Sequence, residues 1–94
     1  MLIKLSRPLE HDGKTLDGLT LDLDKLTGLD VEFCAREATI AAGGAIAVLN
    51  LDVGFHAQVA ARACGLPVEI LRKLPAPDFI AATMAVQGFL FGSG

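Results

Sequence analysis

The side chains with the most obvious capacity for chemistry are two histidines, because histidine changes its charge near neutral pH and serves as a general acid or base. His56 lies near the start of a predicted helix, and His11 lies in a predicted turn. A histidine that activates a nucleophile needs a serine or cysteine beside it and a carboxylate to orient it. The sequence places no such pair beside either histidine. We therefore expect His11 to be a solvent-exposed turn residue, and we expect no catalytic residues and no enzyme.

Cysteines, acidic residues and paired glycines are the other groups that could hold a metal or cofactor. Cys34 and Cys64 have no CxxC or His/Cys spacing around them, so we expect two buried free thiols in a reducing compartment. An acidic run that lacks the spacing of an EF-hand loop is expected to be a solvated face (Asp17, Asp22, Asp24 and Asp30). Gly43-Gly44 is followed by no Gly-Lys-Ser or Gly-Lys-Thr, which a phosphate loop requires. The sequence thus predicts no metal, no cofactor and no small-molecule substrate.

The composition instead points to contacts with proteins. The chain has 94 residues, of which 52% are hydrophobic, and its mean hydropathy is +0.51. A short chain buries only about two thirds of its unfolded surface, so part of this apolar surface is expected to meet a partner or a second copy. A net charge of −3 and a pI of about 5.1 argue against nucleic-acid binding, since no basic cluster is present.

No segment has the pattern of a leader or a membrane span. The first five residues are too quickly charged for a signal peptide. The longest apolar stretch, Ala38 to Leu51, is interrupted by Gly43-Gly44 and Asn50, and a bilayer span needs about 20 apolar residues. We therefore expect a soluble, cytoplasmic protein without membrane contact.

Residues 1–24 are predicted to form a β-hairpin. Asp12-Gly13 is a strong turn signal because both residues tolerate positive φ. Pro8 is expected to end pairing in the first strand, since proline has no N–H to donate. Leucines alternate with polar residues from Leu19 to Leu23, which predicts a half-buried strand. Such a hairpin is marginal alone, so it must pack on helices.

Helical spacing begins after the hairpin. Thr27 is a candidate N-cap, and Leu29, Phe33 and Ile40 are expected to form the apolar face of a helix that ends at Gly43-Gly44. The apolar run 45–51 fits either a short strand or the entry to the next helix, and its periodicity does not decide between them.

Three further helices complete the predicted fold. One runs from an N-cap at Asp52 to Cys64, a short one covers Val68 to Lys73, and the last begins at Pro77. The expected architecture is a single α+β domain over 1–94, in which an N-terminal β-hairpin (1–24) packs on three to four short helices (27–91). A flexible tail follows (92–94).

The last helix is the predicted protein-binding element. It is apolar almost all the way round, since Thr83 and Gln87 are its only polar side chains from Phe79 to Phe91. A helix that is apolar on every side needs more cover than a small domain supplies. The expected contact residues are its largest apolar side chains (Phe79, Ile80, Met84, Phe89, Leu90 and Phe91). The alternative is that this helix packs wholly into the domain's own core.

The order of these signals resembles the small tail assembly chaperones of contractile-tailed (Myoviridae-like) phages and prophages. The resemblance runs nearly end to end and rests on seven short patterns (Leu5-x-x-Pro8 with Gly13, Leu19-x-Leu21, Asp30, Ala60-Ala61-Arg62-Ala63-Cys64-Gly65-Leu66-Pro67, Leu71-x-x-Leu74, Asp78-Phe79 and Phe89-Leu90). Cys64 departs from the pattern, which has Thr or a similar small residue there.

The resemblance implies a non-enzymatic function. Such chaperones coat the long helical tape measure protein, keep it soluble while tail tube subunits are recruited, and are absent from the finished virion. The implied partners are the tape measure protein and the tail tube protein, and many members also occur in a longer, frameshifted form. The alternative is a small oligomeric adaptor or regulator unrelated to phage tails.

Overall fold

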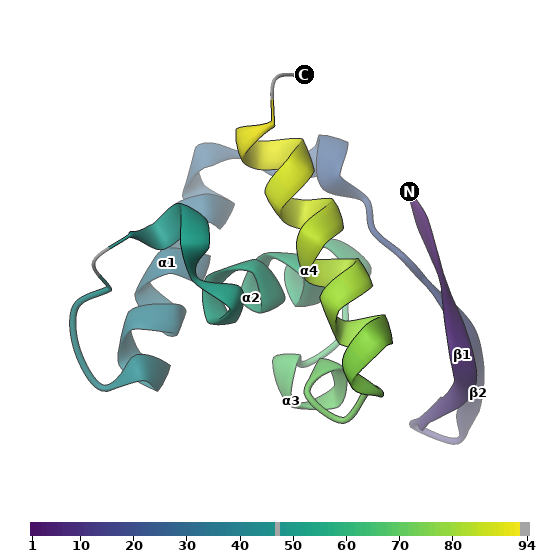
Figure 1. The fold of residues 1–94 in the computed structure, drawn as a ribbon. Coiled ribbons are helices and arrows are strands. Elements are labelled where there is room, and N and C mark those ends of the chain that lie inside the picture. Colours follow the sequence, from purple (N-terminus) through teal and green to yellow (C-terminus); the bar gives the residue numbers. More distant parts are fainter. Residues whose placement is uncertain (47, 93–94) are drawn as a thin grey trace.

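The computed structural model describes residues 1–46 and 48–92, within which a two-stranded antiparallel hairpin is followed by helices (Figure 1). The predicted α+β class is thereby confirmed. In chain order the elements are β1 (Leu2–His11), β2 (Lys14–Thr20), the 3-10 helix η1 (Leu23–Lys25), α1 (Gly28–Ala42), the 3-10 helix η2 (Leu49–Leu51), α2 (Val53–Cys64), α3 (Val68–Leu71) and α4 (Ala76–Phe91). Residues 93–94 of the predicted tail lie outside the described residues.

The hairpin turns at Asp12-Gly13, as predicted. Both residues have positive φ, 55° and 74°, which is the backbone geometry that a tight hairpin turn demands. β2 ends at Thr20, so the predicted strand through Leu23 is too long. The leucines still alternate inward past the strand end, because Leu21 is fully buried and Leu23 is buried within η1.

β1 bulges away from β2 in its middle. The regular pairing is interrupted between Lys4 and Leu9 and resumes beyond Pro8, so the expectation that Pro8 ends pairing is wrong. Proline is tolerated within a bulge because its missing N–H breaks no ladder bond there. The bulge frees Ser6, whose backbone N–H and hydroxyl both donate to Oδ2 of Asp78 in the first turn of α4, at 3.1 and 2.8 Å.

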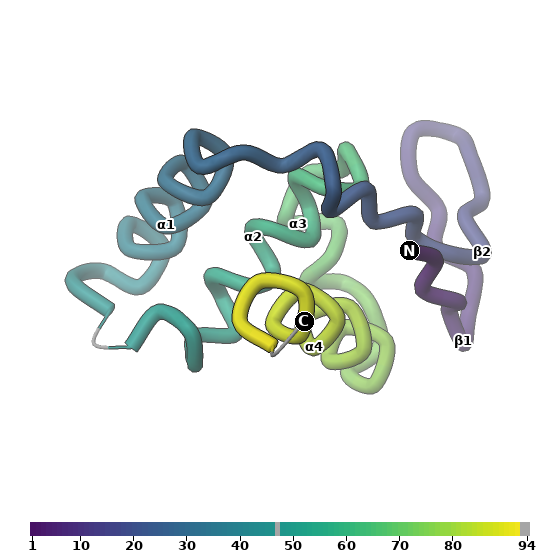
Figure 2. The backbone as a smooth tube through the Cα atoms, turned by 90° about the horizontal axis from the view of Figure 1, so that it is seen from above, coloured from purple at the N-terminus to yellow at the C-terminus, as the bar shows by residue number. Residues whose placement is uncertain are grey.

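Helix α2 lies at the centre of the helical part. It contacts α1 on one side and α4 on the other, and α3 lies beside it (Figure 2). Seen from above, α1 and α4 flank α2, while the hairpin stands at the end of the assembly nearer α4 (Figures 1 and 2). This arrangement leaves the outward sides of α1 and α4 pointing in different directions.

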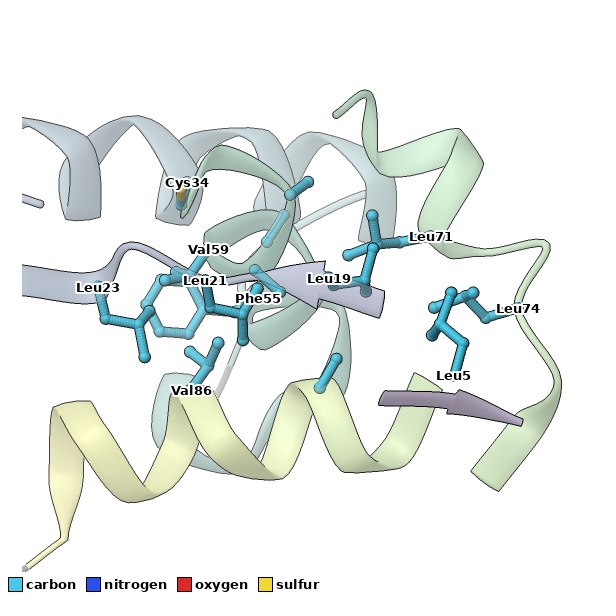
Figure 3. Close-up of a cluster of buried hydrophobic side chains, with 14 residues drawn as sticks. Leu5, Leu19, Leu21, Leu23, Cys34, Phe55, Val59, Leu71, Leu74 and Val86 are labelled. Carbon is cyan, nitrogen blue, oxygen red and sulfur yellow. The ribbon is translucent and has the colours of Figure 1, made fainter. Parts of the chain in front are cut away.

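The core gathers leucines from the hairpin onto α2 and α4 (Figure 3). Phe55 and Val59 of α2 face Leu21 and Val86, and all four side chains are almost completely buried. The remaining large members come from the hairpin, from η1 and from the segment around α3 (Leu5, Leu19, Leu23, Leu71 and Leu74). The inward positions predicted for Leu71 and Leu74 are confirmed.

The predicted caps at Thr27 and Asp52 and the predicted stop at Gly43 are confirmed, whereas α4 begins at Ala76 rather than at Pro77. The side chain of Asp52 accepts a hydrogen bond from the backbone N–H of Phe55 at 2.7 Å, which caps α2. At the start of α1, the backbone N–H of Thr27 donates to Asp30 at 2.8 Å. Gly43 stops α1 in the left-handed conformation with φ of 78°, where only glycine is free of strain.

The expected apolar face of α1 is wrong. Leu29, Phe33 and Ile40 are exposed, and the side that α1 presents to the core carries Cys34 and Ala38 instead. Small residues occupy this side because α1 lies close to α2, which itself presents alanines. The large side chains of α1 are therefore turned toward solvent.

In the segment before α2, the described residues 45–46 and 48–51 form a loop that ends in η2, with no strand among them. The 3-10 turn of η2 leads to the cap of α2, so of the two structures left open by the sequence the entry to the next helix is the one observed. Residue 47 lies outside the described residues. α3 is also shorter than predicted, since its last residue is Leu71 rather than Lys73.

Candidate protein-interaction surface

Helix α4 turns its small and polar side chains inward. Asp78, Ala82, Thr83 and Val86 are buried. Thr83 donates its hydroxyl to the carbonyl of Ile80 within the helix, at 3.1 Å. The thin polar stripe of α4 therefore lies on its buried side, although polar side chains usually face water.

Gln87 makes a contact outside its own helix. Its side-chain Nε2 donates to the backbone carbonyl of Asn50 at 3.2 Å. This bond ties the last turns of α4 to η2. Since Asp78, Thr83 and Gln87 are all hydrogen-bonded, the remaining surface of the helix is left to apolar groups.

The outward side of α4 is a continuous apolar row. Its members are all exposed and lie within about 100° of one another around the helix axis (Pro77, Ile80, Ala81, Met84, Gly88 and Phe91). We call these six residues the outer row. None of them has a charged or hydrogen-bonding side chain, and no charged residue occurs anywhere from Phe79 to Phe91.

The six predicted contact residues fall into three groups. Ile80, Met84 and Phe91 belong to the outer row and are exposed by 46%, 62% and 44%. Phe89 is also exposed, but it lies about 180° around the helix from Ile80 and is not part of the row. The remaining two, Phe79 and Leu90, are partly buried against the core.

Phe91 contributes to both the surface and the core. Its ring lies 6.3 Å from the ring of Phe55 and 6.1 Å from that of His56, measured between centroids, and both pairs are tilted. Tilted aromatic pairs at such distances attract one another. Met84 has no such role in the core and is therefore the better residue with which to test the surface alone.

A pocket of about 290 Å³ opens beside the outer row where α4 meets η2. Met84, Gly88 and Phe91 line it from α4, and Asn50 lines it from η2. Oδ1 of Asn50 is buried without a hydrogen-bond partner. The outer row thus combines a ridge of large side chains with a hollow that can take one side chain of a partner.

His56 is buried beneath Phe91 near the start of α2. It is 4% exposed, and its Nε2 has no hydrogen-bond partner. Burial lowers the pKa of His56 below its usual 6.5, so the ring is neutral at physiological pH. His11 is half-buried at the end of β1 rather than exposed, which corrects the expectation from the sequence.

A second surface with apolar side chains lies on the other side of α2, and the sequence argument missed it. A groove of about 390 Å³ separates α1 from the end of α2 and from α3. Phe33 and Ile40 line it from α1, and charged side chains stand around it (Glu37, Arg62, Glu69 and Arg72). The signal for this surface is the small size of Cys34 and Ala38, which mark the true inward side of α1.

One apolar side chain of α1, Phe33, lies beneath a charged group. The guanidinium of Arg62 lies over the ring of Phe33, 4.4 Å from its centroid, and is also paired with Asp30. The backbone N–H of Thr27 and, after it, Arg62 hold the pKa of the Asp30 carboxyl below its usual 3.8. Phe33 is thus partly shielded from water by a cation held in place by a carboxylate.

The cysteines are free, and they lie inside or at the edge of the core. Cys34 is buried, and Cys64 is half-buried. Burial raises the pKa of both thiols above the usual 9.0, so little thiolate exists at neutral pH.

Among residues 1–46 and 48–92, no three metal-binding side chains gather in one place. Nor does any helix in this part of the chain have the length and hydropathy to cross a bilayer.

Comparison with known proteins gives one match. A family model described as "Phage tail assembly chaperone proteins, E, or 41 or 14" matches residues 2–90, from the first residue of β1 to the penultimate residue of α4. No curated protein and no solved structure gave a match.

Proposed function

Because the chain belongs to the phage tail assembly chaperone family, we propose that it binds the tape measure protein of a contractile-tailed phage or prophage and helps to recruit tail tube subunits. In this proposal the protein acts without enzymatic chemistry, in the cytoplasm of the bacterial host, and is absent from the mature virion. Its task is to cover the apolar stripes of a long helical partner until the tube has formed.

The outer row of α4 is the observation that carries this proposal. It exposes Ile80, Met84 and Phe91 on one side of a helix, with no charge to keep that side in water. Helical partners are commonly bound through apolar anchors spaced along one face. Phe and Met supply large and adaptable contact area for such an anchor pattern. The pocket beside Gly88 offers a place for one large side chain of the tape measure helix.

The groove along α1 supports the recruitment of a second protein. Because α2 lies between α1 and α4, the groove and the outer row occupy different sides of the molecule. A tape measure helix on α4 therefore leaves the groove open. The charged side chains around the groove, among them Arg72 and Glu69, favour a partner that carries polar groups, as the surface of a folded tube subunit does.

Co-purification tests the first half of the proposal. The chaperone is expressed with the tape measure protein encoded in the same genome, and the retained partner is quantified on the tagged chaperone. We expect the wild-type chain to retain the tape measure protein. Met84→Asp is expected to reduce retention at least about tenfold, because a charge placed in an apolar contact must be desolvated without a partner.

Ile40→Asp is the matched control. Ile40 is 69% exposed and Met84 is 62% exposed, so both variants add the same charge to equally exposed helical positions. Ile40→Asp is expected to retain the tape measure protein as the wild type does. Equal loss in both variants would show that α4 has no special part in binding, and a wild-type chain that retains nothing would overturn the proposed function.

Ionic strength gives an independent test. Attraction between exposed charges is largely screened in concentrated salt, whereas burial of apolar surface is not weakened. Since the outer row has no charge, we expect retention of the tape measure protein to survive washing in about 1 M NaCl. Release of the partner at that concentration would place the contact on a charged surface instead.

A further inference from the structure

We propose that the outer row of α4 also pairs with the outer row of a second copy of this chain, so that the free chaperone is a weak dimer that must separate before α4 can take its partner. The existence of the dimer does not depend on the proposed function. The competition with the tape measure protein rests on it.

Because the outer row carries no charge, the outer rows of two copies can meet without repulsion between like charges. When two copies meet through identical surfaces, the residues near the two-fold axis lie beside their own counterparts, and like charges at those positions repel. The outer row has no charged residue, and Asp78, the nearest acid in the chain, is buried against Ser6. The groove along α1 lacks this property, because Glu37, Glu69 and Arg72 stand around it.

The shape of the outer row also suits a second helix. Ile80, Met84 and Phe91 recur at spacings of four and seven residues and so line up on one side of α4. Gly88 interrupts this ridge, and a Cβ placed on it would meet no atom within 4 Å. A glycine with open space above it lets another helix approach closely, while the large side chains on either side pack around the contact.

The available area sets the strength of the pairing. A large apolar side chain has about 200 Å² of surface, so the exposed parts of the outer row come to on the order of 400 Å² per copy. A pair would then bury on the order of 800 Å², whereas stable interfaces bury about 1,200–2,000 Å². The pairing is therefore weak and reversible, as a contact must be if it is to give way to another partner.

Dimerisation and binding of the tape measure protein exclude each other because both use the outer row. In a dimer, the outer row of each copy is covered by the other copy and cannot contact the tape measure helix. The apparent affinity for the partner therefore falls as the chaperone concentration rises above the dissociation constant of the dimer. The dimer shields the apolar surface while the partner is absent.

Sedimentation analysis of the full chain over a wide concentration series tests the dimer. We expect the wild-type mass to rise from 9.8 kDa toward twice that value and no further. Met84→Asp should remain at 9.8 kDa at every concentration, whereas Leu29→Asp, at an exposed position of α1 outside the groove, should associate as the wild type does. Circular dichroism melting of both variants shows whether they are folded. A wild-type chain that stays monomeric, or a mass that grows beyond two copies, would overturn the inference.

Titration of the dimer with the co-expressed tape measure protein tests the exclusion. A fluorophore pair on two chaperone copies is expected to lose energy transfer as the partner is added. Energy transfer that persists in the complex would mean that α4 pairs with itself but does not compete. If Met84→Asp abolishes the dimer and still retains the tape measure protein, the dimer stands and the proposed binding surface is wrong.

Discussion

Helices α1 and α4 lie on either side of α2, and both expose large apolar side chains, but their surroundings differ. On α1, charged residues stand between Leu29, Phe33 and Ile40, and Arg62 lies over the Phe33 ring. On α4, no charged or polar group occurs in the outer row. Water can hydrogen-bond to the charged groups of α1. The outer row of α4 offers water no charged or hydrogen-bonding side chain.

The difference teaches that exposure alone does not identify an interface. Single apolar side chains on a surface are ordinary, and Ile40 is even more exposed than Met84. What distinguishes α4 is that its exposed residues adjoin one another with no polar group between them, which is the pattern of a covered surface. If this difference matters, substitutions on α4 and α1 should change the stability of the fold by different amounts.

The largest effect is expected from the buried side of α4. Val86→Asp places a carboxylate in the core, where it has no partner, and should lower the free energy of unfolding by at least about 3 kcal/mol. Met84→Asp, two residues earlier on the outer row, should melt close to the wild type. Thermal melting followed by circular dichroism makes the measurement. If Met84→Asp unfolds the chain as Val86→Asp does, the outer row belongs to the core and the comparison with α1 fails.

The next largest difference is expected between the two helices' first-turn carboxylates, in the stability that is lost when each is replaced by alanine. Asp78 of α4 is buried and accepts two hydrogen bonds from Ser6, so Asp78→Ala should cost about 1.5–3 kcal/mol of stability. Asp30 of α1 is paired at the surface, and Asp30→Ala should produce a smaller shift in denaturant midpoint. Asp78→Asn, which keeps an acceptor oxygen, is the control. Equal shifts for the two alanine variants would show that the buried Asp78 stabilises the fold no more than the surface residue Asp30 does.

As the pH falls, stability should be lost through His56 before it is lost through Asp30 of α1. The pKa of His56 is lower in the fold than its usual 6.5, so below that pH the unfolded chain binds the extra proton and stability falls. The slope is at most about 1.4 kcal/mol per pH unit. The pKa of Asp30 is also lowered, from 3.8, so its contribution is lost only in stronger acid. Denaturant unfolding between about pH 7.5 and about pH 5 should show the first loss, and His56→Phe should abolish it. A slope that survives in that variant would assign it to another group.

The smallest effects concern two glycines and should have opposite signs. Gly88 lies inside α4 with open space above it, so Gly88→Ala should raise stability by about 0.5–1 kcal/mol. Gly43 ends α1 with φ of 78°, so Gly43→Ala should lower stability by about 1 kcal/mol. Melting temperatures resolve shifts of this size in a short chain. A loss of stability in Gly88→Ala would mean that something already covers the outer row.

Local signals predicted much of the fold. The turn at Asp12-Gly13, the cap at Asp52 and the stop at Gly43 each depend on residues within a few positions of one another. The bulge in β1 could not be predicted in this way, because its bond between Ser6 and Asp78 joins residues 72 positions apart. Only the folded arrangement shows that the backbone N–H of Ser6, which has no partner on β2, donates to Asp78 instead.

The sequence identified α4 as the candidate helix but not its outward side. The lack of charge in α4 can be read from the sequence alone. Which side of α4 faces outward is decided by α2 and the hairpin, and these select Val86 rather than Met84 for the core. On α1 the sequence likewise did not show which side faces the core. Phe33 was predicted to be buried because it is larger than Cys34, but Cys34 is the buried residue. Size predicts burial poorly where two helices approach closely.

The bond between the β1 bulge and the first turn of α4 has a consequence for synthesis. The ribosome completes β1 long before it makes α4, and until then Ser6 has no acceptor and Leu5, Leu19 and Leu21 lack the helix that encloses them. Contacts between such distant parts of a chain form slowly, because a long loop must close first. The nascent hairpin therefore spends translation with its apolar side uncovered. The chain is therefore most vulnerable to misassociation in the interval before its last helix docks.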